Sequence, residues 1–130
     1  MGNLKVIIKN IGIFIAGITL GGIINMSLII TGGLVFPFYE NFNPMNAINW
    51  DFKYFIFPFL AHALGTLSGS FIASKLSNNK SNIIPLIIGI YFLAGGIYMM
   101  TILPAPTWFI ILDLSLCYIP MAFLGWKISQ

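Results

Sequence analysis

The stretch AHALGTLSGSFIASKL, residues 61–76, decides the fold because it carries two parallel rows of residues at four-residue spacing. The first row consists of small residues: Ala61, Gly65, Gly69 and Ala73. The second row lies beside it and is polar: His62, Thr66 and Ser70. Residues four apart share one face of an α-helix, so each row marks a stripe. In lipid, close backbone approach across small residues supplies much of the packing between helices, so the first stripe predicts a helix contact.

Outward from this stretch, most of the chain is apolar. Of its 130 residues, 58% are hydrophobic and 7% are charged, whereas roughly a quarter of the residues in soluble domains are charged. Four apolar runs reach the roughly 20 residues that a membrane-spanning helix needs, at about 7–36, 54–76, 83–103 and 107–127. We therefore predict an all-α integral membrane protein in which residues 1–130 form a single four-helix transmembrane domain. The first run is too long for a signal-peptide core and no A-x-A-like cleavage site follows it, so we interpret it as a span.

The positions of the lysines predict the topology. They precede the first span, flank the link between the second and third spans, and follow the fourth: Lys5, Lys9, Lys75, Lys80 and Lys127. On the other side lies only Lys53, together with Glu40 and Asp51. Positive-inside bias then predicts that both termini are cytoplasmic and that the chain lies in a bacterial inner (plasma) membrane.

The first helix offers a partner for the small stripe. Gly17 and Gly21 lie four residues apart, and Asn25 continues their row. This spacing predicts that the first and second helices cross at their glycines. The sequence leaves open whether the Ala61–Ala73 stripe faces a helix of the same chain or another copy in an oligomer.

Each of the four predicted helices brings one polar group to the same outer layer, counted at about 1.5 Å per residue: Asn25, His62, Tyr98 and Asp113. A charge inside the bilayer costs a few kcal/mol on insertion scales, so Asp113 needs a partner, and His62 lies at a suitable depth. We hypothesise an outward-opening pocket for a ligand or proton, formed by Asn25, His62, Thr66, Tyr98 and Asp113. The alternative to the pocket is a buried hydrogen-bond cluster that fixes the helix register. A separate alternative for the polar row is that Thr66 and Ser70 bond only to backbone carbonyls one turn back, which would need no function.

The motif AHALGTLSGSFIA, together with LPAPTWF (103–109) and with YIPMAFLG (118–125) after Asp113, resembles a group of small four-span bacterial membrane proteins. The resemblance covers most of the chain. It implies the four-span fold and a bacterial membrane, and it brings no established activity to transfer.

Three classes of function compete. The first is binding or transport of a small solute or proton through the pocket, and the second is an accessory subunit that docks through an outward-facing small-residue stripe. An intramembrane enzyme comes third, because one histidine, one buried acid and one cysteine fall short of a zinc site. We therefore predict no catalytic residues, no metal and no cofactor. The predicted partners are the lipid bilayer and either a homo-oligomer or a larger membrane complex, with no nucleic acid.

Overall fold

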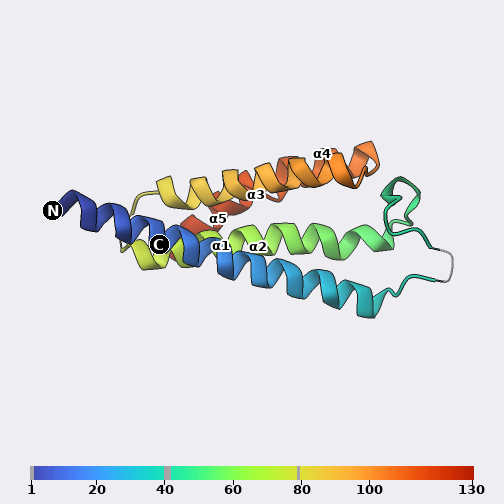
Figure 1. The fold of residues 1–130 in the computed structure, drawn as a ribbon, viewed down its shortest axis with the longest axis horizontal. Coiled ribbons are helices and arrows are strands. Elements are labelled where there is room, and N and C mark those ends of the chain that lie inside the picture. The colour runs from blue at the N-terminus through green and yellow to red at the C-terminus, as the bar shows by residue number, and fades with distance from the viewer. Residues whose placement is uncertain (1, 40–41, 79) are drawn as a thin grey trace.

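The computed structural model describes residues 2–39, 42–78 and 80–130, and the regular elements of this part of the chain are helical (Figure 1). Glu40, one of the charges used to predict the topology, lies outside the described residues. The elements are α1 (Gly2–Val35), η1 (Ala47–Asn49), α2 (Lys53–Ser77), α3 (Ile83–Ile102), α4 (Thr107–Leu116) and α5 (Ile119–Ser129).

Among the described residues, four helical segments are long and apolar enough to cross a membrane: α1, α2, α3 and the combined segment Thr107–Ser129. The all-helical class and the four candidate spans are thus confirmed, and they suggest a multi-pass membrane protein. Both termini lie toward one end of the bundle, which we call the terminal end, and residues 36–39 and 42–52 lie at the other, the loop end (Figure 1). The cytoplasmic placement of the termini stays a prediction.

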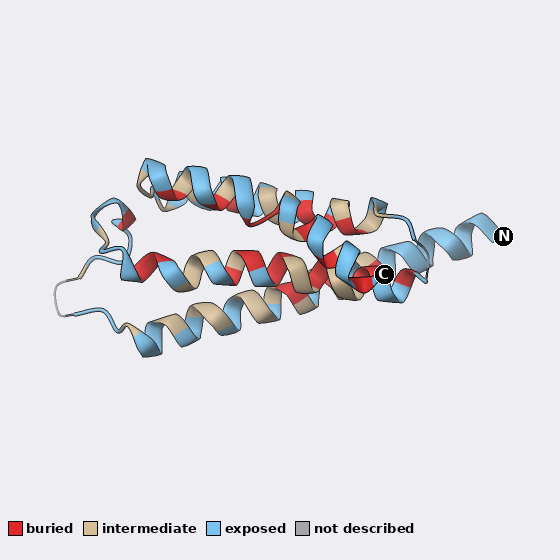
Figure 2. Ribbon diagram, turned by 180° about the vertical axis from the view of Figure 1, so that it is seen from behind, coloured by how far each residue is buried: buried red, intermediate tan, exposed pale blue. Residues whose placement is uncertain are grey.

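The first helix extends beyond the rest of the bundle. Its 34 residues correspond to about 50 Å at 1.5 Å per residue, against a hydrocarbon core of about 30 Å. Residues 2–12 are all exposed (Figure 2). The packed part of α1 therefore begins at Ile13 and contains Gly17 and Gly21.

The small stripe of α2 packs against α1 in the same chain. A Cβ atom placed on Gly69 would lie 2.6 Å from the carbonyl oxygen of Gly17, and one on Gly65 would lie 2.8 Å from that of Gly21. Real Cβ contacts are longer, so only glycine allows the two backbones to approach this closely. The predicted crossing of the first two helices is confirmed. The stripe is buried, so the accessory-subunit alternative lacks the exposed face that it requires.

At the terminal end, α5 closes the bundle against α2 and α3. A Cβ atom on Gly89 would lie 2.6 Å from the Cβ atom of Ala122. The Ser70 hydroxyl donates a hydrogen bond to the Ala122 carbonyl oxygen. Ser70 on α2 thus bonds to α5. The alternative that Ser70 bonds to a carbonyl of its own helix one turn back is therefore wrong.

The fourth span is interrupted in its middle, although the sequence predicted one continuous helix. α4 ends at Leu116 and α5 begins at Ile119, leaving Cys117 and Tyr118 between them. Pro120 explains the break, because it has no N–H group to donate to the Leu116 carbonyl and its ring clashes with that carbonyl in a regular helix. The two halves then pack differently: α5 contacts α2 extensively, whereas α4 touches α2 at few points.

Candidate functional site

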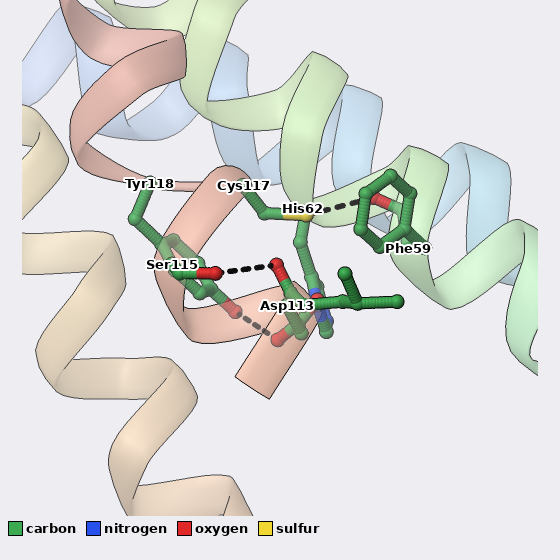
Figure 3. A network of polar contacts seen from close by, with 7 residues as sticks. Phe59, His62, Asp113, Ser115, Cys117 and Tyr118 are labelled. Carbon is green, nitrogen blue, oxygen red and sulfur yellow. Dashed lines mark hydrogen bonds and ion pairs between the residues drawn. The ribbon is translucent and has the colours of Figure 1, made fainter. Parts of the chain in front are cut away.

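A hydrogen-bond network surrounds the carboxyl group of Asp113 on α4 (Figure 3). The Nδ1 atom of His62 lies 2.7 Å from Asp113 Oδ1. The Tyr118 hydroxyl donates to Asp113 Oδ2 over 3.1 Å. Each oxygen of the carboxyl group therefore has a partner, and the Asp113 side chain is completely buried.

The pairing determines which nitrogen of His62 remains available. An ionised carboxylate only accepts hydrogen bonds, so Nδ1 carries a hydrogen and donates it to Asp113. The other ring nitrogen, Nε2, can then accept a hydrogen bond when the imidazole is neutral and donate one when it is charged. The side chain of His62 is 23% exposed, against 0% for Asp113. The network thus orients a partly accessible imidazole with a buried acid.

Tyr118 reaches Asp113 because of the helix break. On an uninterrupted helix, residues five apart are separated by about 140° around the axis, so their side chains point away from each other. The interruption at Cys117 and Tyr118 removes this separation. A Cβ atom on Gly96 of α3 would lie 2.5 Å from the Tyr118 hydroxyl oxygen, so Gly96 leaves the room that the tyrosine occupies. The Tyr118 ring also stacks on His62, with the ring centroids 5.7 Å apart.

Two cavities meet at His62. The larger has a volume of about 460 Å³, lies toward the loop end and is lined mainly by apolar side chains of α1, α2 and α3. The smaller, of about 270 Å³, lies among α1, α2 and α3, and Tyr118 adds to its wall. Asn25, His62 and Met99 line both cavities. His62 thus stands at the junction of an apolar and a more polar space.

One residue that lines the smaller cavity has an unsatisfied hydroxyl group. Thr66 is 1% exposed, and its Oγ1 atom is buried without a hydrogen-bond partner among the described residues. Leaving such a group unpaired costs on the order of 1–3 kcal/mol. Thr66 lines the smaller cavity together with Asn25 and His62, but its hydroxyl oxygen is buried beneath the cavity wall.

The structure brings together most of the predicted site residues. Asn25, His62 and Thr66 line the cavities, and Asp113 lies behind His62. Tyr98 is not brought to the site: it is 63% exposed and lies about 200° around α3 from Gly96, which faces Tyr118.

Sequence reasoning missed Tyr118. The signal that could have found it is Pro120, which predicts a break close to Asp113 within the fourth span.

Comparison with known protein families, with curated proteins and with solved structures finds no match to this chain. The resemblance to small four-span bacterial membrane proteins therefore stays a prediction.

Proposed function

We propose that the protein binds a small solute in the larger cavity and exchanges a proton with it through His62. The observation that carries this proposal is the position of His62. Its ring lines a cavity of about 460 Å³, while its Nδ1 atom is held 2.7 Å from the fully buried Asp113. The volume falls in the range of about 300–1,000 Å³ typical of small-molecule sites.

The chemistry of the network supports proton exchange. Histidine is the side chain whose ordinary titration falls near neutral pH, so small changes in its surroundings change its charge. Asp113 and Tyr118 hold the ring in place without using Nε2. A solute with a carboxyl, amine or hydroxyl group could give a proton to Nε2 or take one from it, while Asp113 balances the charge of the imidazolium.

The access to the site supports a role in transport. The larger cavity reaches His62 from the loop end, and the terminal half is closed by the contacts of α1, α2 and α5. A site open toward one end of a helical bundle is one of the two states that alternating-access transport requires. The helix interrupted beside the site is also a feature of many transporters.

The test uses the fact that His62 is the only histidine in the chain. The protein is purified with a histidine-free tag, placed in lipid nanodiscs and treated with diethyl pyrocarbonate, which acylates free imidazole nitrogen. Mass spectrometry then measures the modification rate of His62. We expect His62 to be modified in the folded protein, because its ring is partly exposed and lines both cavities. A His62 that reacts only after unfolding would overturn the proposal and favour a purely structural cluster.

A matched pair of variants sharpens this test. Asp113→Asn removes the acid that orients the ring, so it should change the modification rate. Tyr98→Phe removes a hydroxyl at a similar height on the exposed side of α3, so it should leave the modification rate unchanged.

A further inference from the structure

We infer that the solute is an apolar amine, which binds as its ammonium ion with the charged nitrogen at His62 and Asn25 and the apolar body in the larger cavity. This inference rests on the proposed function, because it names the class of solute that exchanges a proton with His62. The polar group of the solute therefore lies beside the imidazole ring.

Two unpaired polar groups lie at the junction of the two cavities. Asn25 and His62 line both cavities. Within the described part of the chain, the Asn25 amide forms no hydrogen bond, and the hydrogen bond of His62 uses Nδ1 alone. Neither the Asn25 amide nor His62 Nε2 belongs to the unpaired atoms that are buried there. Both groups therefore keep surface that a solute can reach.

Helix packing holds these two groups close together. A Cβ atom on Gly65 would lie 3.0 Å from the Cβ atom of Asn25. Gly65 follows His62 by three residues on α2, and residues three apart on a helix are neighbours on one face. Asn25 on α1 thus lies about one turn of α2 from the imidazole ring, so one small polar group can contact both side chains.

The charge of the site favours an amine over a carboxylic acid. With Asp113 ionised and His62 neutral, the pair carries one negative charge. An ammonium ion brings the total to zero, and the total stays zero when its proton moves to His62. A carboxylic acid leaves one negative charge in both states of the same exchange. An uncompensated charge is costly away from water, so the amine is the better match.

Lys53 does not reverse this preference. It is the other charged residue among the described residues that line the cavities. It is nine residues from His62 on α2, which corresponds to about 13 Å along the helix. Its side chain is exposed, as is that of Asp51, so water and the opposite charge of Asp51 weaken its field at the imidazole.

The hydrogen-bonding groups and the rings of the site also match an ammonium ion. An ammonium group only donates hydrogen bonds, while neutral Nε2 and the Asn25 amide oxygen accept them. The rings of Phe92 and Tyr118 line the smaller cavity beside His62, and a cation is attracted to the face of an aromatic ring. The apolar body then extends into the larger cavity, whose wall includes Met99.

The proton exchange is simple in this arrangement. One N–H bond of the ammonium ion breaks, and its electron pair stays on the amine nitrogen. The lone pair of Nε2 forms the new N–H bond. The solute becomes a neutral amine and His62 becomes an imidazolium, which Asp113 faces at 2.7 Å.

The experiment compares three ligands with the same apolar body and different head groups. Phenylbutylamine, phenylbutanol and phenylbutyrate are cationic, neutral and anionic at neutral pH. Each is titrated onto the protein in nanodiscs of zwitterionic lipid, and the thermal unfolding midpoint reports binding. We expect the amine to bind about tenfold more tightly than the alcohol, and the acid more weakly than the alcohol. An alcohol or acid that binds as tightly as the amine would overturn the inference.

A matched pair of carboxylate variants tests the source of this preference. Asp113→Asn removes the negative charge behind His62, so the amine should bind less than about twofold more tightly than the alcohol. Asp51→Asn removes an exposed carboxylate that lines neither cavity, so the tenfold preference should remain. A preference that survives Asp113→Asn, or one that Asp51→Asn abolishes, would overturn the inference.

A second variant keeps the inference testable if Asp113→Asn fails to fold. Asn25→Leu has a similar shape and removes an amide that has no partner among the described residues. The affinity for phenylbutylamine should fall about threefold. The control on the same helix is Asn10→Leu, because Asn10 is exposed and lines neither cavity. Equal amine affinities of these two variants would overturn the placement of the nitrogen at Asn25.

The two proposals fail in different ways. A His62 that is acylated in the folded protein, together with no preference for the amine, would overturn the amine and leave the cavity function in place. A His62 that is unreactive in the acylation test would overturn the cavity function itself.

Discussion

The two halves of the bundle are built from different side chains and have opposite properties. In the terminal half, glycine lets the backbones of α1 and α2 touch, as at Gly17 and Gly69. In the loop half, α4 meets α2 through aromatic rings, as at Phe55 and Phe109, whose centroids are 4.6 Å apart. Small residues therefore close one half, and large rings hold the helices of the other apart around a cavity of about 460 Å³. The division lies at the His62–Asp113–Tyr118 network.

The largest expected effect comes from breaking the closed half. Gly69→Leu would place a large side chain where even a Cβ atom lies 2.6 Å from the Gly17 carbonyl oxygen. We expect a loss of about 3 kcal/mol or more in the free energy of unfolding, because the obstacle is backbone. Gly22→Leu is the control, since a Cβ atom at Gly22 has no neighbour within 4 Å. Thermal unfolding in detergent measures both, and equal midpoints would contradict the packing of α1 on α2.

The next effect concerns the network at the division. Asp113→Ala should cost about 3 kcal/mol, because it leaves His62 and Tyr118 without their buried acceptor. A double-mutant cycle with His62→Ala tests the pairing: the double variant should lose less than the sum of the two single variants, by about 1 kcal/mol. Strictly additive losses would mean that the 2.7 Å contact contributes no coupling.

A smaller effect is expected on α3, where two adjacent glycines differ. A Cβ atom on Gly96 would lie 2.5 Å from the Tyr118 hydroxyl oxygen, whereas one on Gly95 has no neighbour within 4 Å. Gly96→Ala should therefore destabilise the protein by about 1 kcal/mol, since the end of the tyrosine must move away from Asp113. Gly95→Ala should be neutral. In a Tyr118→Phe background the cost of Gly96→Ala should shrink, and an unchanged cost would place the clash elsewhere.

The smallest effect compares two tyrosines. Tyr118→Phe should cost about 1 kcal/mol, because it removes the hydrogen bond to Asp113 Oδ2. Tyr98→Phe should change the free energy of unfolding by less than about 0.5 kcal/mol, since its side chain is exposed. Chemical denaturation of both variants in the same detergent measures the difference. A larger loss for Tyr98→Phe would show that the exposed face of α3 carries a contact.

The sequence predicted the parts of this architecture that depend on spacing within a regular helix. The four-residue spacing predicted that Gly65 and Gly69 lie on one face of a helix. A lone acid in an apolar span is costly, which predicted that Asp113 pairs with His62 at the same depth. Depth, however, gives only the height of a residue along its helix. Tyr98 has the expected height and faces away, because the side that a residue presents depends on how its helix is rotated.

Tyr118 escaped prediction for the opposite reason. Tyr118 lies in the break between α4 and α5. The helical periodicity of the fourth span therefore does not give the direction in which its side chain points. The cavity could not be predicted either, because its size depends on how rings such as Phe55, Trp108 and Phe109 space the helices in three dimensions. Ser70 likewise bonds to Ala122, a partner 52 residues away.

The break at Cys117 and Tyr118 also has a mechanical consequence. The fourth span consists of two short helices. The first, α4, has ten residues, and the Asp113 carboxyl group holds it to His62 and Tyr118 close to the break. The second helix, α5, packs against α2 and α3. A small tilt of α4 at Cys117 and Tyr118 would move Phe109, the α4 residue that lines the larger cavity, while α5 stayed packed against α2 and α3. The acid that orients His62 and an aromatic residue of the cavity wall, Phe109, are thus carried on the same short helix.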